Sequence, residues 1–224
     1  MRLKPITAII VVLCSIFVSC LDDHQEPIDL SLKVGNIYCE DGNIYPVDYF
    51  LEQNTAPAGI ITAVGGPNDN YRALVMALED IGNTYYLNNI EEKISNVSSD
   101  VTLFDGKENT AALLVASLKS DSIVQLKPAG AILCSSYRAS GKGAWHLPSV
   151  AELRTVASSY TAIVSSLKAI GADMLQQRYQ TSTVDGSSNN NEQLFNYTIE
   201  LPKGNISSTL KTESHPVRPF MILR

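Results

Sequence analysis

The sequence lacks the residues from which most metal and redox sites are built. Its 224 residues include only four cysteines and three histidines, and neither a CxxC nor an HExxH pattern occurs. Zinc sites and dithiol redox sites need such ligands at close, characteristic spacings. No nucleophile can be paired with a general base either. We therefore expect no metal, no cofactor and no enzymatic activity.

The sequence also lacks a basic cluster and a hydrophobic run long enough to cross a bilayer. Its 17 Lys and Arg face 23 Asp and Glu, a formal net charge of −6. An acidic chain is repelled by phosphate backbones, which disfavours nucleic-acid binding. The longest apolar run, Ile6 to Val18, has about 13 residues, whereas a spanning helix needs roughly 20. This length is typical of the hydrophobic core of a signal peptide.

The N-terminal segment has the other parts of a secretion signal as well. Arg2 and Lys4 precede the apolar run, and Ser19-Cys20 ends it. This order resembles the lipobox of bacterial lipoproteins, in which a small residue stands before a cysteine that becomes acylated. The resemblance implies that residues 1–19 are a lipoprotein signal peptide and that lipidated Cys20 anchors the mature chain in the membrane. The alternative is a plain signal peptide that leaves Cys20 free.

A short acidic segment follows this cysteine, with Asp22 and Asp23 at its start. It resembles the signal that sends some Gram-negative lipoproteins to the exterior face of the outer membrane; an ordinary solvated tether is the alternative. We expect residues 20–33 to form a flexible tether. Removing residues 1–19 takes away two basic residues and no acidic one, which leaves 15 basic against 23 acidic residues, a net charge of −8.

Two cysteines, Cys39 and Cys134, remain in the mature chain. Export permits a disulfide between them. Small free cysteines are also common in protein cores, so the sequence leaves the bridge open.

The first half of the mature chain is predicted to consist mainly of strands. Residues 37–39 lead into Asp41-Gly42, a turn pair typical of hairpins. The apolar runs 58–64 and 71–78 flank a segment rich in turn formers, which predicts a second hairpin with strands buried on both faces. The polar residues 83–104 are expected to form a long surface loop.

Helices are predicted next. Asp105 and Glu108 have the spacing of a helix start. Four positions after them repeat with helical period and predict the buried face: Ala111, Leu114, Val115 and Leu118. Pro128 can open a short helix with three apolar residues on one side: Ala129, Ile132 and Leu133.

A further helix is predicted from Ser149-x-x-Glu152, which is a capping box. Its apolar stripe continues through Ile163 to Ile170, and Gly171 is placed as a C-terminal cap.

The last 45 residues return to strands. They are predicted over residues 179–183, 194–201 and 217–223, with a turn over residues 202–205. Strands, then helices, then strands indicate an α+β fold. No Pro-, Gly- or Ser-rich linker divides residues 34–224, so we expect one domain.

Five motifs in fixed order resemble a bacterial C-type-lectin-like domain. They are Asp41-Gly42, Asp105-Gly106-Lys107-Glu108-Asn109-Thr110, Trp145-x-Leu147-Pro148-Ser149-x-x-Glu152-Leu153, Tyr179-x-Thr181-Ser182-Thr183 and Val217-Arg218-Pro219-Phe220. Such domains occur in surface lipoproteins and, in similar form, in retroelement variable proteins, and they share their fold with formylglycine-generating enzymes. The resemblance covers residues 34–224. It implies a mixed sheet with flanking helices, paired N- and C-terminal strands, and ligand contacts from loops of the C-terminal third.

The sequence departs from this family at one motif and lacks other family chemistry. Gln180 replaces the Trp of a usual Tyr-Trp pair, which puts packing or ligand contact there in doubt. The Glu-Pro-Asn and Trp-Asn-Asp motifs of calcium-dependent sugar-binding lectins are missing from the domain. Residues 135–224 contain no cysteine, so the sequence does not support the cysteine chemistry of formylglycine-generating enzymes.

The predicted binding surface consists of polar residues in two C-terminal stretches, 185–193 and 205–215, together with Gln180. Small polar side chains offer adaptable hydrogen bonding; solvated loops are the alternative. The candidate ligand-binding residues are Gln180, Asp185, Ser187, Asn189, Asn190, Asn191, Asn205, Ser207, Thr209, Lys211 and His215.

Other conspicuous residues are interpreted as structural: Trp145, His146, Pro148, Ser149, Glu152 and Arg218. The favoured function is a surface ligand-binding or adhesion module for an unknown glycan or protein. The alternative is a structural accessory subunit of a surface fibre or outer-membrane assembly. The oligomeric state is left open.

Overall fold

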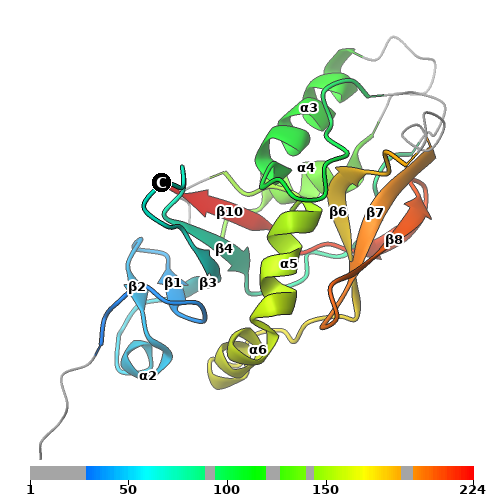
Figure 1. Cartoon of the computed structure of the whole chain (residues 1–224). Helices are drawn as coiled ribbons and strands as arrows, with labels where there is room; N and C mark the ends of the chain where they lie inside the picture. Colours follow the sequence, from blue (N-terminus) through cyan, green and yellow to red (C-terminus); the bar gives the residue numbers. More distant parts are fainter. Residues whose placement is uncertain (1–28, 89–93, 120–126, 140–143, 188–193) are drawn as a thin grey trace, which may run out of the picture.

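The protein has an α+β fold made of three antiparallel sheets with helices packed between and beside them (Figure 1). A computed structural model describes residues 29–88, 94–119, 127–139, 144–187 and 194–224. The predicted signal peptide, Cys20 and most of the tether lie outside the described residues. Leu32 and Val34 already pack against the core.

The largest sheet contains five strands in the order β10-β4-β3-β1-β2. The strands are β1 (Ile37–Cys39), β2 (Ile44–Tyr45), β3 (Pro57–Val64), β4 (Ala73–Ala77) and β10 (Phe220–Leu223). Both predicted hairpins, β1–β2 and β3–β4, are confirmed. β4 is buried at every position, as the continuous apolar run predicted. A short helix, α2 (Val47–Phe50), follows β2.

Two features implied by the family resemblance differ from the structure. Every pairing between the described strands is antiparallel, so the sheet is not mixed. The first and last strands share this sheet, but β10 pairs with β4, whereas β1 pairs with β3 and β2. The β3–β4 hairpin therefore separates the chain ends, because its two apolar strands take the central places.

Two smaller sheets occupy the opposite side of the molecule. One contains β6 (Arg178–Val184), β7 (Phe195–Glu200) and β8 (Asn205–Leu210) in sequence order. The other pairs β5 (Asn83–Tyr85) with β9 (Ser214–Pro216).

The predicted loops in this region were partly wrong. The stretch 205–215 forms β8 and the start of β9, and residues 83–104 contain β5. Tyr86 and Leu87 after β5 are buried. Polar residues of these strands hydrogen-bond to neighbouring strands, and hydropathy alone cannot reveal such partners.

Helix α5 (Val150–Ser158) lies between the five-stranded and three-stranded sheets and contacts both (Figure 1). The predicted capping box is present, and α6 (Tyr160–Ala169) follows directly. α6 ends as predicted at Gly171, whose φ is 67°. The Gly171 and Ala172 N–H groups donate to carbonyl oxygens of the last turn, which is a Schellman motif.

The two preceding helices exist as predicted, but their buried faces were wrong. In α3 (Gly106–Lys119), Val115 and Leu118 are exposed, and the buried side carries Asn109, Thr110 and Leu113. In α4 (Ala129–Ser136), the buried residues are Gly130, Ala131 and Cys134, while Ile132 and Leu133 are exposed. The apolar periodicity predicted the wrong buried faces because both helices direct small or hydrogen-bonding side chains toward the interior.

Cys39 and Cys134 are buried free thiols in different core clusters, so they form no disulfide. Burial, together with the nearby Asp41, raises the pKa of Cys39 to about 11, and burial raises that of Cys134 well above its usual value. Both thiols are therefore protonated and shielded in the folded protein.

We expect a thiol reagent to label neither cysteine of the folded mature protein and both after unfolding. The measurement is a count of reactive thiols before and after guanidinium chloride, with iodoacetamide-blocked protein as the control. A third reactive thiol would show that Cys20 is unacylated and would contradict lipidation.

Candidate functional site

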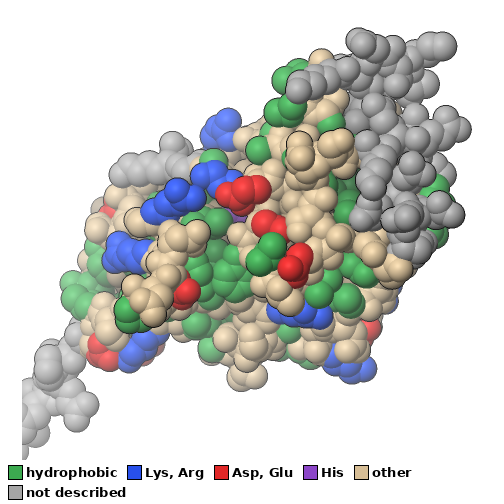
Figure 2. Space-filling model, turned by 45° about the horizontal axis from the view of Figure 1, so that its top comes forward, with side chains coloured by type: hydrophobic (Ala, Val, Ile, Leu, Met, Phe, Trp, Pro, Cys, Tyr) green, Lys and Arg blue, Asp and Glu red, His purple; other side chains and the backbone are tan. Residues whose placement is uncertain are grey.

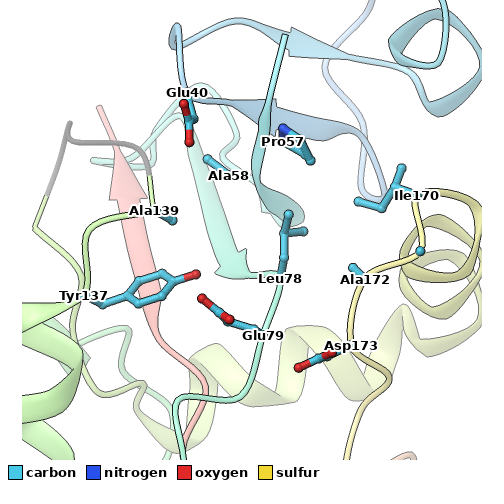
Figure 3. Close-up of a pocket in the computed structure, with 11 residues that line it drawn as sticks. Glu40, Pro57, Ala58, Leu78, Glu79, Tyr137, Ala139, Ile170, Ala172 and Asp173 are labelled. Atoms are coloured by element: carbon cyan, nitrogen blue, oxygen red, sulfur yellow. The ribbon is translucent and has the colours of Figure 1, made fainter.

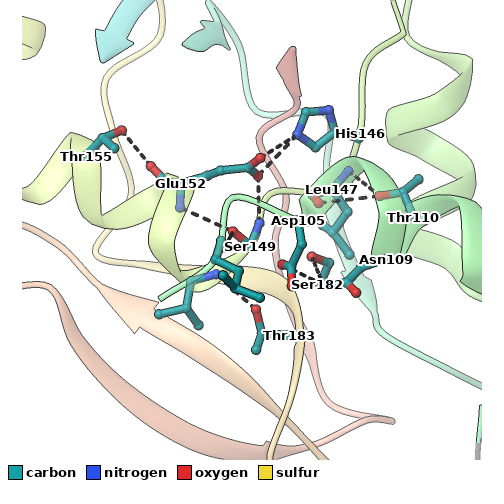
Figure 4. A network of polar contacts seen from close by, with 12 residues as sticks. Asp105, Asn109, Thr110, His146, Leu147, Ser149, Glu152, Thr155, Ser182 and Thr183 are labelled. Carbon is teal, nitrogen blue, oxygen red and sulfur yellow. Dashed lines mark hydrogen bonds and ion pairs between the residues drawn. The ribbon is translucent and has the colours of Figure 1, made fainter. Parts of the chain in front are cut away.

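The segment from His146 to Glu152 is the polar centre of the domain (Figure 4). Ser149 begins α5: its Oγ accepts the Glu152 N–H at 3.3 Å, and its N–H donates to Glu152 Oε2 at 2.8 Å. The Ser149 hydroxyl donates to the Leu103 carbonyl oxygen at 2.8 Å. One cap therefore holds both the helix start and the chain entering α3.

The buried partner of this cap is His146. Its Nε2 lies 3.1 Å from both Glu152 carboxylate oxygens, and the two side chains are 1% and 0% exposed. The His146 backbone exchanges two hydrogen bonds with Phe220 of β10. The pair therefore ties α5 to the edge of the five-stranded sheet.

Helix α3 docks on the same centre through polar contacts. Thr110 Oγ1 accepts the Leu147 N–H at 3.0 Å, and the Asn109 amide donates to Asp105 Oδ1 at 3.0 Å and Ser182 Oγ at 3.3 Å. A Cβ at Gly106 would lie 2.2 Å from Glu152 Oε2, so only glycine permits this approach. These side chains hydrogen-bond to one another and to neighbouring backbone groups, which makes the centre a structural hub.

The residues interpreted as structural are all buried: Trp145, His146, Pro148, Ser149, Glu152 and Arg218. The Trp145 ring contacts the Tyr137 ring edge-on at 5.1 Å between centroids. Arg218 belongs to a second polar cluster beneath a surface pocket.

Four residues predicted to bind ligand are buried and lie away from the surface. Gln180 is 0% exposed and its amide donates to the Thr84 carbonyl oxygen at 3.0 Å. Thr209 donates to the Asn196 carbonyl oxygen, and the Lys211 ammonium lies 5.7 Å from the Tyr86 ring centroid. Asp185 is bound by its neighbours in the same way. These assignments are corrected, because the side chains serve strand pairing and packing.

Of the other predicted residues, Asn205 and Ser207 lie on β8 of the three-stranded sheet, Ser187 follows β6, and His215 lies on β9 of the two-stranded sheet. Ser187 and Asn205 are exposed, and Ser207 and His215 are half-buried. Asn189, Asn190 and Asn191 lie outside the described residues. The structure therefore brings together fewer accessible ligand-binding residues than the polar stretches predicted.

Asp185 joins the end of β6 to β7 and β8. Its Oδ1 accepts the Tyr197 hydroxyl at 2.8 Å and the Ser187 N–H at 2.9 Å, and its Oδ2 accepts the Ser208 hydroxyl at 2.5 Å. Burial acts to raise the pKa of Asp185, but the hydrogen bonds from Ser208, Ser187 and Tyr197 outweigh it and hold the pKa at about 2. The ionised form is thus the one that the fold favours.

Replacing Asp185 with asparagine is expected to lower the free energy of unfolding by about 2 kcal/mol at pH 7. Because the folded-state pKa is depressed, this stabilisation is complete above pH about 4 and is lost as the pH falls toward 2. Urea unfolding at pH 7 and pH 2.5 measures the difference, with exposed Asp48→Asn as the control. An equal loss at both pH values would contradict the carboxylate's role.

A surface pocket of about 440 Å³ lies where the end of β4 meets the segment after α6 (Figure 3). Glu40, Glu79 and Asp173 bring three carboxylates to it, and the Tyr137 hydroxyl points toward Glu79. Burial is the main cause that raises the pKa of Tyr137, with Glu79 adding to it. The pocket is acidic at its rim and apolar at Leu78, Ile170 and Ala58. This pocket was not predicted, because its residues come from five separate segments.

Fully buried Arg218 forms an ion pair with partly exposed Asp80 beneath this pocket. Arg218 Nε lies 2.7 Å from Asp80 Oδ1, and its Nη2 donates to the Leu78 and Asp173 carbonyl oxygens at 3.3 and 3.1 Å. The Tyr179 hydroxyl donates to the same carboxylate at 2.9 Å. Burial raises the pKa of Asp80, and Arg218 acts against that rise. Three chain segments thus meet at one guanidinium.

The described residues contain neither a candidate metal-binding group nor a candidate membrane-spanning helix. No group of three or more His, Cys, Asp or Glu side chains there could hold a metal ion. No helix within the same ranges is long and apolar enough to cross a membrane. Figure 2 shows one face, where hydrophobic side chains reach the surface between charged side chains of both signs.

Comparison with known proteins gives a likeness of fold. No protein-family model matches the chain, and no curated protein matches it. A solved structure of a fimbrial protein from Bacteroides ovatus ATCC 8483 is similar, with a TM-score of 0.60 and 19% sequence identity. The match covers 86% of this chain and 49% of the fimbrial protein, so the chain spans about half of that protein's length.

Proposed function

We propose that this chain is a lipid-anchored accessory subunit of a bacterial surface fibre, with a structural rather than a catalytic role. The observation that carries the proposal is the fold likeness to a fimbrial protein over 86% of the chain. The lipobox-like Ser19-Cys20 supports attachment to a membrane, and the acidic tether supports the exterior face. The hydrogen-bonded hub around Glu152 supports a rigid scaffold, because its buried side chains connect α5, α3 and β10.

The test is a fibre preparation from the native bacterium with an epitope tag after Arg224, a residue that is exposed in the structure. We expect the tagged protein to co-purify with sheared surface fibres, and its deletion to reduce their number or attachment. Cys20→Ala should release the protein from the membrane, whereas Cys14→Ala, in the apolar signal run, should not. A protein that never enters the fibre fraction, with fibres unchanged by deletion, would refute the proposal.

A ligand-binding module is the second candidate, and a specific observation favours it. Asn205 on β8 and Ser187 just after β6 are exposed polar residues beside the three-stranded sheet, and a concave acidic pocket lies elsewhere. Glycan arrays and host-protein pull-downs with the full chain would test it. Ser187→Arg and Asn205→Arg should abolish a genuine interaction at this sheet, whereas Ser165→Arg, on exposed α6, should not. Equal binding by all three variants would exclude this surface.

A further inference from the structure

The outer edge of β8 carries a row of backbone groups that no described strand pairs. β8 is the last strand of its sheet, after β6 and β7 (Figure 1). The Lys211 N–H donates to the Leu194 carbonyl oxygen, and register then places Thr209 opposite Asn196 and Ser207 opposite Thr198. Hydrogen-bonded pairs alternate along an antiparallel ladder. Ile206, Ser208 and Leu210 therefore direct their N–H and C=O groups away from β7.

This edge has none of the features that usually prevent strand addition. Edge strands are commonly protected by lysine, proline or a bulge. The sequence Asn205-Ile206-Ser207-Ser208-Thr209-Leu210 has no charge and no proline, and its register against β7 runs without interruption. The edge is thus six residues long, regular and uncharged.

The edge is also complementary to a second copy of itself. An antiparallel pairing with its two-fold axis at Ser208 sets Ser208 opposite Ser208 of the second copy. It also sets Ile206 opposite Leu210 at both ends. Each of these positions offers an outward N–H and C=O. The Leu210 oxygen already accepts the Glu213 N–H at 2.9 Å but retains a second lone pair.

The side chains agree with this register. Ile206 and Leu210 are half-buried in the single chain, and they would form two apolar cross-strand pairs. A two-fold axis sets any charged residue near it against its own copy, which is unfavourable in a chain of net negative charge. β8 contains no charged residue, so this pairing brings no like charges together within the strand.

From these observations we infer that β8 is a self-association edge, through which two copies of this chain join their three-stranded sheets into one six-stranded sheet. A closed two-fold dimer uses the same patch on both partners. The inference goes beyond the proposed fibre role and does not depend on it. Cell-surface concentration by a lipid anchor would favour such pairing, because it raises the local concentration of the partners.

Cysteine cross-linking tests the register in the full-length lipidated protein, purified in detergent. Hydrogen-bonded antiparallel partners have Cα atoms about 5.5 Å apart, within disulfide range. We expect Ser208→Cys to give a disulfide-linked dimer on mild oxidation, with at least roughly tenfold more product than Ser207→Cys. Ser207→Cys is the matched control, because its cysteine lies on the same strand and the protein is purified in the same detergent. Equal yields would overturn the register.

A backbone variant tests the hydrogen bonds themselves. Ser208→Pro removes an N–H that faces away from β7, and edge strands tolerate proline in that orientation. Ser208→Ala is the control, because it loses the same hydroxyl bond to Asp185 and keeps the N–H. We expect the proline variant to weaken dimerisation by about tenfold or more relative to alanine, measured by light scattering over a concentration series.

Two further outcomes would overturn the inference. One is a wild-type chain that stays monomeric at every concentration. The other is a Ser208→Cys chain that cross-links to a different fibre protein and never to itself. The second outcome would leave the proposed fibre function standing, so the two proposals fail separately.

Discussion

Arg218→Ala is expected to lower the free energy of unfolding by about 3–5 kcal/mol, which is a large part of the roughly 5–15 kcal/mol that stabilises an ordinary domain. Arg218 has no exposed side-chain surface and binds Asp80 and the carbonyl oxygens of Leu78 and Asp173. Removing the guanidinium leaves a carboxylate of low exposure without its counter-charge and two carbonyl groups without a donor. It also leaves a cavity between β4, β6 and the start of β10.

Urea unfolding at constant temperature measures this loss, with exposed Arg72→Ala as the matched control, expected to change stability by less than about 0.5 kcal/mol. Without Arg218, burial and the nearby Asp173 raise the pKa of Asp80 further, and only the Tyr179 hydrogen bond acts against them. A raised folded-state pKa costs stability as the pH rises, so the loss should be larger at pH 7 than at pH 4. In Asp80→Asn/Arg218→Met both charges are gone, and it should be more stable at pH 7 than Arg218→Ala. A loss independent of pH would contradict the ion-pair explanation.

Glu152→Ala is expected to have a comparable effect, about 3–5 kcal/mol at pH 7. It removes the acceptor of the Ser149 N–H and the partner of His146, and both groups remain buried. Ser149→Ala removes only the hydroxyl half of the cap and should cost about 1 kcal/mol. Glu152→Ala should cost more than Ser149→Ala because Glu152 has two contacts to lose. It accepts the Ser149 N–H, and it holds the side chain of His146, whose backbone pairs with β10.

The matched control for this residue is Glu108→Ala, an exposed glutamate at the same position of the first turn of α3. It should cost less than about 1 kcal/mol. Glu152→Gln keeps an acceptor for the Ser149 N–H and should be intermediate between wild type and Glu152→Ala. Thermal and urea unfolding of the four proteins would measure the order. Equal stability of Glu152→Ala and Glu108→Ala would show that the hub is not needed for the fold.

The best sequence predictions concern local structure with a local cause. The capping box at Ser149, the cap at Gly171 and the β3–β4 hairpin all depend on residues within a few positions of one another. The α+β class followed from the order of such elements. The lipobox-like N-terminus is also a local signal, and lipidation of Cys20 stays a prediction that the thiol count tests.

The wrong predictions concern polar residues that are buried in the folded protein. The apolar period of α3 placed Val115 and Leu118 in the core, yet Asn109 and Thr110 face the interior. Thr209 and Lys211 were assigned to a binding loop, yet they lie on or beside β8. Each of these four polar side chains has a partner more than ten residues away in sequence, and only the folded chain brings the two together.

The sequence by itself determined the helix caps, the hairpin turns, the acidic charge and the signal-like N-terminus of this protein, because each depends on neighbouring residues or on composition. The tertiary structure decided which polar side chains are buried, how β10 meets β4, and where the pocket lies. It also decided that β8 is an edge. An edge is a property of strand order, and strand order is set by packing between distant segments, which no local pattern contains.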